Sequence, residues 1–206
     1  MNTPDVVNHE EALRKLLDGN GRYQAGTNCS LNPCPTTISL DSGQSPFAAF
    51  IRCADSRVAP EIVFDQPLGS LFVCGVAGNI PTVEIVASLE YAVCVLGTKL
   101  IVIMGHSSCG AVTAALEDEM TRSHLPGNLP ELIERIHVST RDVAPNSKTM
   151  LDDAIAANAR CAVDQLLQMS HVIKDLVDRE EVQVIAGVED LKSGHFEVLR
   201  QAFKKS

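Results

Sequence analysis

Short apolar runs alternate with longer amphipathic stretches along the chain. Four of these runs are rich in branched or aromatic residues and have the length of buried strands: 46–52, 70–74, 99–104 and 181–188. A fifth run, at 195–199, follows the turn-forming DLKSG segment and predicts a short edge strand. Because helical patterns separate the first four runs, we predict an α/β fold with a mostly parallel central β-sheet flanked by helices.

The helical stretches carry start and stop signals. Asn8 is placed to cap the first helix, and the Gly-Asn-Gly run at 19–21 predicts its end or a bend. The apolar residues of this helix fall on one face: Leu13, Leu16 and Leu17. The helix at 82–96 has little polar surface and is expected to be largely buried. Further helices are predicted after Pro60, at 129–138 and at 150–178.

The totals fit one folded unit. With 206 residues, of which 45% are hydrophobic, the chain is long enough to bury a sizeable core. Neither a repeat nor a low-complexity linker divides the sequence. We therefore predict a single domain over 1–206, with an N-terminal helical arm at about 1–45 and an α/β core at about 46–206.

Charge and hydropathy restrict the classes of partner. The chain has 17 Lys and Arg against 26 Asp and Glu, and its basic residues are scattered, which argues against a nucleic-acid partner bound through a basic patch. Apolar runs such as 100–104 are far shorter than a membrane span, and the acidic first segment does not resemble a signal peptide. We therefore expect a cytoplasmic protein without a membrane partner.

Candidate metal ligands follow two of the predicted strands. Cys53 comes directly after the first strand, and His106 follows the third by two residues. Because the carboxyl ends of parallel strands lie at one edge of a sheet, both side chains are expected at that edge. Cys53 opens a C-x-D-x-R segment with Asp55 and Arg57. Alone, this segment is better explained as a buried cysteine beside a structural ion pair.

A second segment, H-x-x-C-G, puts His106 and Cys109 at a predicted strand-to-helix junction, where a helix N-terminus favours the Cys109 thiolate. Alone, this segment is ambiguous too. The seven cysteines of the chain lack disulfide spacing, and the two segments together supply two thiolates and one imidazole, which suit zinc. We predict one Zn²⁺ per subunit held by Cys53, His106 and Cys109, with the open fourth position that catalysis requires.

The chain resembles the β-carbonic anhydrases in these same segments. The resemblance lies in CADSRVAPE at 53–61, EYAV at 90–93 and GHSSCGAV at 105–112, and it extends to 16–23, Gln44 and 188–199. It implies zinc-dependent reversible hydration of carbon dioxide to bicarbonate and a proton, by attack of zinc-bound hydroxide. It also implies a homodimer, or a dimer of dimers, in which an interface completes each active site.

The resemblance implies roles for further residues. Asp55 would accept a hydrogen bond from the hydroxide and direct its lone pair to the substrate, while Arg57 would keep Asp55 ionised. In some relatives the equivalent aspartate binds zinc instead, and the sequence leaves both arrangements open. The implied substrate-binding residues are Gln44, Phe72, Ala77, Tyr91 and Gly110. On composition alone, Gln44 is a solvated loop residue, and Phe72 and Tyr91 are core residues.

One segment departs from the family pattern. Relatives usually carry an arginine after the Leu-Phe-Val strand segment, followed by Asn or Thr, whereas this chain has Gly75 and Val76. In some relatives that arginine helps to bind a regulatory bicarbonate, so its absence puts this mode of inhibition in doubt. Conversely, Arg52 stands before Cys53, where small residues are frequent. Its guanidinium is predicted to enter the vacated space; the alternative is an arginine that points to solvent.

Two other functions stay open on the sequence alone. The first keeps the zinc site but hydrolyses carbonyl sulfide or carbon disulfide, an alternative to which the change at Gly75 and Val76 gives weight. The second is a non-enzymatic zinc-binding domain. A structural zinc site would need a fourth protein ligand and more often uses paired C-x-x-C segments, none of which occurs in this sequence.

Overall fold

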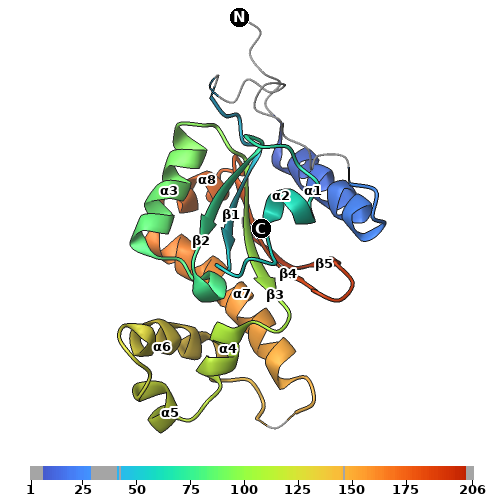
Figure 1. Ribbon diagram of the computed structural model, residues 1–206. Coiled ribbons are helices and arrows are strands. Elements are labelled where there is room, and N and C mark those ends of the chain that lie inside the picture. The colour runs from blue at the N-terminus through green and yellow to red at the C-terminus, as the bar shows by residue number, and fades with distance from the viewer. Residues whose placement is uncertain (1–6, 29–40, 42, 146, 203–206) are drawn as a thin grey trace, which may run out of the picture.

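A five-stranded sheet organises the part of the chain that the computed structural model describes, which is residues 7–28, 41, 43–145 and 147–202. The strand order is β2-β1-β3-β4-β5; the first four strands are parallel and β5 is antiparallel to β4 (Figure 1). The strands are β1 (Ala48–Arg52), β2 (Leu71–Gly75), β3 (Leu100–His106), β4 (Gln183–Glu189) and β5 (Phe196–Ala202). All five predicted strands and their mostly parallel arrangement are confirmed.

Helices cover both faces of this sheet (Figure 1). One face packs against α1 and α2, the other packs against α3, α7 and α8, and α4 to α6 lie beyond the carboxyl ends of the strands. The described helices are α1 (His9–Gln24), α2 (Pro60–Val63), α3 (Val83–Cys94), α4 (Gly110–Ala115), α5 (Glu119–Ser123), α6 (Leu129–Thr140), α7 (Met150–Met169) and α8 (His171–Asp178), with a short 3₁₀ turn, η2 (Ala77–Asn79). None of these helices is both long and apolar enough to cross a bilayer.

The first helix begins as predicted. The Asn8 side chain accepts a hydrogen bond from the Glu11 backbone N–H at 2.9 Å, which satisfies one of the unpaired donors of the first turn. Leu16 is buried and Leu13 packs against the same core, whereas Leu17 is 40% exposed. Two of the three predicted apolar residues therefore pack on this chain's own core.

The glycines that were predicted to end or bend α1 do not end it, because the helix continues to Gln24. A Cβ atom on Gly19 would lie 1.8 Å from the Phe64 carbonyl oxygen, so only glycine permits this close approach. Asn20, which follows it, donates to the Gly194 carbonyl at 2.7 Å and accepts from the Phe196 backbone N–H at 3.0 Å. The Gly-Asn pair therefore packs the helix against α2 and against the turn before β5.

One face of α3 is exposed, so the expectation that this helix is largely buried is wrong for the single chain. The exposed fractions are 72% for Val83, 49% for Tyr91 and 63% for Val95, which follows the last turn. The opposite face is buried against the sheet. An apolar composition predicts burial, but it does not distinguish the chain's own core from contact with another molecule.

The stretch predicted as one helix at 150–178 is two helices that meet at Ser170. The Ser170 hydroxyl accepts from the Ile173 backbone N–H at 3.1 Å, and so caps α8. The same hydroxyl donates to a Glu90 carboxylate oxygen at 2.6 Å, which ties the junction to α3. A long-range contact therefore sets this helix boundary.

Candidate metal centre

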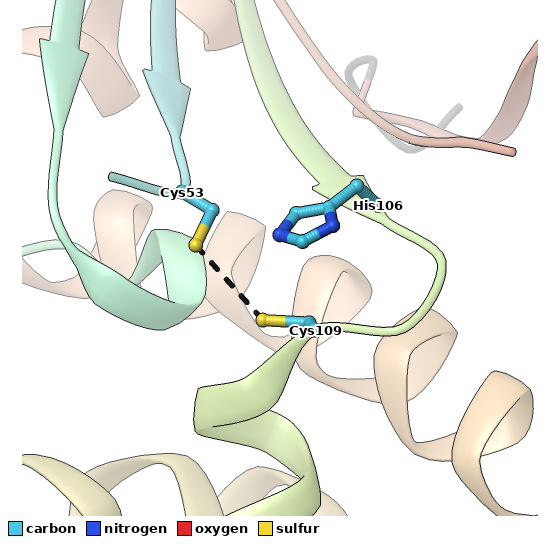
Figure 2. Close-up of side chains that lie close together, drawn as sticks. All are labelled: Cys53, His106 and Cys109. Carbon is cyan, nitrogen blue, oxygen red and sulfur yellow. Dashed lines mark hydrogen bonds between the residues drawn. The ribbon is translucent and has the colours of Figure 1, made fainter. Parts of the chain in front are cut away.

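Three side chains that could hold a metal ion converge beyond the carboxyl ends of β1 and β3 (Figure 2). Cys53 follows β1 directly, and Cys109 precedes the first residue of α4. His106 is the last residue of β3, so the predicted two-residue gap between strand and histidine is wrong. Because β1 and β3 pair in parallel, their ends lie side by side, and the three ligand atoms lie within 4.8 Å of one another. The predicted convergence is confirmed.

The turn between His106 and Cys109 is held from two sides. Ser108 has a φ of +58°, a left-handed conformation that reverses the chain sharply enough for both side chains to face one point. The Ser107 backbone N–H donates to the Glu189 carbonyl at 2.8 Å, and the Ser107 hydroxyl accepts from the Leu191 backbone N–H at 2.9 Å. The end of β4 and the turn that follows it thus anchor the segment that carries two of the three side chains.

His106 presents Nε2 to the two sulfur atoms. Its ring is fully buried, and Nδ1 lies 2.9 Å from the Ser107 carbonyl oxygen, so Nδ1 is assigned as the donor and Nε2 carries the lone pair. Within the described ranges, Nε2 is buried without a hydrogen-bond partner, an arrangement that costs free energy unless an ion binds. Two sulfur atoms and one such nitrogen form a donor set that fits Zn²⁺.

Cys53 and Cys109 lie with their sulfur atoms 3.9 Å apart. The hydrogen bond with Cys109 lowers the pKa of the Cys53 thiol to about 4, although burial opposes this shift, and the backbone amides of Asp55 and Gly78 lower it further. The same contact raises the pKa of Cys109 well above its ordinary value, and burial adds to the rise. The pair therefore contains one thiolate at neutral pH, and the second proton leaves when a dication binds.

Asp55 and Arg57 form a bidentate ion pair beside the three side chains. Arg57 Nε and Nη2 donate to the two carboxylate oxygens at 3.0 and 2.7 Å, and the Arg57 backbone N–H donates at 2.9 Å. These hydrogen bonds hold the pKa of the Asp55 carboxyl well below its usual range. Asp55 Oδ2 lies 4.0 Å from His106 Nε2, so a fixed carboxylate borders the candidate metal position.

The turn after β2 supports Cys53 from the other side. The Ala54 backbone N–H donates to the Val76 carbonyl at 3.2 Å, which places η2 against the start of the Cys53 segment. Asn158 of α7, which is buried, donates to the Gly78 carbonyl at 2.8 Å. Asn158 was not predicted from the sequence. Its signal was a polar residue within the otherwise apolar buried stripe of α7.

The predicted substrate-binding residues do not all lie at the metal centre of one chain. Ala77 belongs to η2, and Gly110 is the first residue of α4, next to Cys109. Phe72 and Tyr91 lie close together, with ring centroids 6.4 Å apart, on the half-exposed side of α3 and β2. Gln44 is exposed and precedes β1, beside Gly69. A five-residue strand spans about 17 Å. Gln44 therefore lies near the amino ends of the parallel strands, whereas the ligands lie at their carboxyl ends.

Glu189, for which the sequence predicted no role, is a buried carboxyl opposite His106 in the pairing of β4 with β3. Neither of its carboxylate oxygens has a hydrogen-bond partner among the described residues. Burial therefore raises the pKa of Glu189 from 4.5 to about 7. The resemblance at 188–199 includes Glu189 but gave it no role, because its isolation depends on which side chains surround it in the fold.

We expect the substitution Glu189→Gln to remove a pH-dependent loss of stability. Between pH 4.5 and about 7 the folded carboxyl holds a proton that the unfolded chain has released, so the free energy of unfolding falls as pH rises through this interval. Urea unfolding at equal metal content should show the variant gaining on the order of 1 kcal/mol relative to wild type between about pH 6 and about pH 8.5.

The exposed Glu197 on β5 offers a matched control, since Glu197→Gln changes the same group at the surface. The gain with pH should be absent from that variant. If the free energies of unfolding of Glu189→Gln and wild type differed by the same amount at both pH values, Glu189 would not be protonated in the folded protein.

Residues 48–196 match the family described as carbonic anhydrase. The chain is 34% identical over 195 residues to carbonic anhydrase 2 of Mycobacterium tuberculosis, with 91% of each chain covered. It is 38% identical over 166 residues to the carbonic anhydrase of Mycolicibacterium smegmatis, with 79% of each covered. Its fold is similar to that of a tetrameric β-carbonic anhydrase of Sordaria macrospora, with a TM-score of 0.71 at 24% identity over 91% of this chain and 96% of that one.

Proposed function

Since the chain belongs to the β-carbonic anhydrase family, we propose that it catalyses the zinc-dependent, reversible hydration of carbon dioxide to bicarbonate and a proton. The observation that carries this proposal is the convergence of Cys53, His106 and Cys109 beside a carboxylate held by an arginine. Three protein ligands leave a fourth position for the reacting water. The nearest further carboxylate, that of Asp55, is bonded to Arg57, so it is not free to act as the fourth permanent ligand that a structural site would need.

Zinc would be held by the Cys53 and Cys109 thiolates and by His106 Nε2. When bound, Zn²⁺ supplies a Lewis acid that lowers the pKa of water from 15.7 to near 7, so that a hydroxide nucleophile is available at neutral pH. His106 donates from Nδ1 to the Ser107 carbonyl, and this hydrogen bond fixes the ring so that Nε2 faces the site.

Asp55 orients the reacting water. Its carboxylate accepts the water's hydrogen bond on the side of His106, while Arg57 fixes the carboxylate with three hydrogen bonds and keeps it ionised. A carboxylate that is ionised and fixed before the reaction directs the nucleophile's lone pair away from itself and toward the substrate. The pairing of Asp55 with Arg57 supports the arrangement in which water takes the fourth position.

The negative charge of two thiolate ligands lowers the Lewis acidity of the site, and neighbouring hydrogen-bond donors offset part of this effect. Two thiolates cancel the charge of a dication, so a Cys₂His site is a weaker Lewis acid than an all-histidine site. The backbone amides of Asp55 and Gly78 lower the pKa of Cys53, because they donate to its sulfur. These donors withdraw charge from the thiolate and therefore partly restore the acidity of the site.

We further propose that two copies complete one active site. Within one chain, Gln44 and the ligands lie at opposite ends of the parallel strands. The Gln44 amide would therefore reach a substrate at the metal centre only if that centre belonged to a second copy. The exposed apolar face of α3 and the edge strand β2 offer a surface for that copy. The similar protein from Sordaria macrospora is described as tetrameric, which supports a homodimer or a dimer of dimers.

Replacing Val83 and Val95 together with lysine is expected to separate the subunits, because two unpaired charges would enter the interface. The dissociation constant of the dimer should rise by about 100-fold or more, measured by sedimentation velocity over a dilution series. Met120→Lys is the matched control, since Met120 is 74% exposed on α5. Equal dissociation constants for wild type and the double variant would show that α3 is not part of the interface.

One experiment tests the function directly. Stopped-flow hydration of carbon dioxide and release of hydrogen sulfide from carbonyl sulfide should be compared on one preparation of known zinc content. We expect hydration to dominate. Dominant sulfide release would favour the carbonyl sulfide or carbon disulfide hydrolase, to which Gly75 and Val76 give weight. One zinc per chain without either turnover would favour a non-enzymatic zinc-binding domain.

A further inference from the structure

Arg52 is the last residue of β1 and lies over Gly75 of the neighbouring strand β2. A Cβ atom on Gly75 would be 3.5 Å from Arg52 Cζ and 3.7 Å from both Nε and Nη2. The guanidinium therefore fills the space that the glycine leaves, as the sequence predicted. An alanine at position 75 would make ordinary van der Waals contact with it, whereas a longer side chain on this face would compete for the space.

The guanidinium is also bonded to the segment that carries the candidate ligand. Arg52 Nη1 donates to the Cys53 carbonyl at 2.6 Å and to the Asp55 carbonyl at 3.2 Å. Arg52 Nε is buried and has no hydrogen-bond partner within the described part of the chain. Arg52 is partly buried, and its hydrogen bonds to backbone carbonyls argue against an arginine that only points to solvent.

These two bonds act on the backbone on either side of Ala54. One nitrogen holds two carbonyl groups two residues apart, so it restricts the peptide planes that orient the Cys53 sulfur and the Asp55 carboxylate. A metal site works only when its side chains are held within about 0.5 Å of the productive geometry. Charged donors are suited to this task, because their hydrogen bonds are roughly twice as strong as neutral ones.

We propose that Arg52 is a positioning residue of the metal centre, which fixes the Cys53–Asp55 turn through its carbonyl groups and needs a small residue at position 75 to do so. This inference rests on the proposed function, since it presumes that Cys53 binds a metal and that Asp55 orients water. Arg52 acts through these two residues and does not touch the reacting atoms.

Two substitutions separate hydrogen bonding from packing. Arg52→Met keeps the length of the side chain over Gly75 but removes the donors, while Arg52→Lys keeps the charge and one donor group. We expect Arg52→Met to release zinc to a chromophoric chelator about 10- to 100-fold faster than wild type, with kcat lowered by about 10-fold or more and KM within about twofold. Arg52→Lys should recover part of both losses.

A spectroscopic readout reports the geometry without relying on activity. Protein loaded with Co²⁺ in place of zinc absorbs through its thiolate ligands, and this absorption should shift in Arg52→Met but not in Gly75→Ala. Arg200→Met is the matched control, since Arg200 is also a strand arginine that donates to a backbone carbonyl, that of Arg160, and it pairs with Asp164 on a distant edge of the sheet.

The inference fails if Arg52→Met releases zinc at the wild-type rate and keeps the wild-type cobalt spectrum. It also fails if Arg52→Met and Arg200→Met lose zinc equally fast, because the effect would then be general destabilisation. A wild-type protein that binds cobalt through thiolates but does not hydrate carbon dioxide would overturn the proposed function instead. In that case zinc release and the spectrum would still decide the role of Arg52.

Discussion

Replacing Cys53 with alanine is expected to abolish both zinc binding and hydration activity. The purified variant should hold less than about 0.1 zinc per chain after dialysis against a chelator, where wild type holds about one. The reason is that His106 and Cys109 alone leave the ion with two protein ligands at the ends of one short turn. Metal analysis by mass spectrometry, together with stopped-flow hydration, measures both losses.

The size of the effect follows from the energy of zinc binding. Structural zinc sites bind with roughly 10–16 kcal/mol, so one of three ligands accounts for roughly 3–5 kcal/mol if the ligands contribute equally. That loss weakens binding by roughly 10²- to 10⁴-fold. Because Cys53 belongs to the buried core, alanine also leaves a small cavity, whose cost in stability is separate from the loss of metal.

Cys74→Ala separates these two effects. Cys74 is a partly buried cysteine on β2 that lies outside the three-residue cluster. This variant should keep one zinc per chain and near wild-type turnover, although it also loses a sulfur atom from the protein interior. If Cys53→Ala retained a full equivalent of zinc, the proposed ligand set would be wrong.

The positions of the candidate ligands could be predicted because they depend on short-range features. Cys53 directly follows one apolar run and His106 lies two residues beyond another, and parallel strands bring their carboxyl ends to one edge of the sheet. Cys109 is three residues beyond His106, so one turn was enough to place it. Hydrophobic pattern and sequence distance therefore contained most of the information about this constellation.

The surroundings of the site depend on contacts between distant segments and could not be predicted in this way. Asn158 and Glu189 approach the site only through the packing of α7 and β4, although they lie 105 and 136 residues beyond Cys53 in the sequence. The break at Ser170 depends on Glu90 of another helix. An apolar pattern along one segment carries no information about which distant polar group lies opposite to it.

The residues that the resemblance assigns to substrate binding could not be placed from the sequence for a different reason. Gln44 belongs to the same motif set as the ligands, yet within one chain it lies at the other edge of the sheet. The apolar face of α3 was predicted to be buried and is exposed. Both disagreements have one physical explanation if a second copy covers this face, because a sequence pattern does not show whether the partner surface belongs to the same chain.

Replacing Asp55 with alanine should leave zinc in place while lowering kcat for hydration by about 100-fold or more. Asp55 Oδ2 lies 4.0 Å from His106 Nε2 and belongs to no hydrogen bond that holds the three ligands, so its removal spares the metal. What is lost is the oriented acceptor for the water proton. Zinc content and stopped-flow kinetics on the same sample separate binding from turnover.

Asp55→Asn tests whether charge or shape is responsible. Asparagine keeps the size of the side chain but loses the negative charge that Arg57 fixes with two side-chain hydrogen bonds. If the carboxylate is needed to accept the water's hydrogen bond, kcat of Asp55→Asn should be close to that of Asp55→Ala. Arg57→Lys keeps a cation but loses the bidentate geometry, so it should lie between these variants and wild type. Wild-type turnover by Asp55→Ala at full zinc content would remove Asp55 from the mechanism, and the acidity of the water would then have to come from the ligands and their backbone donors alone.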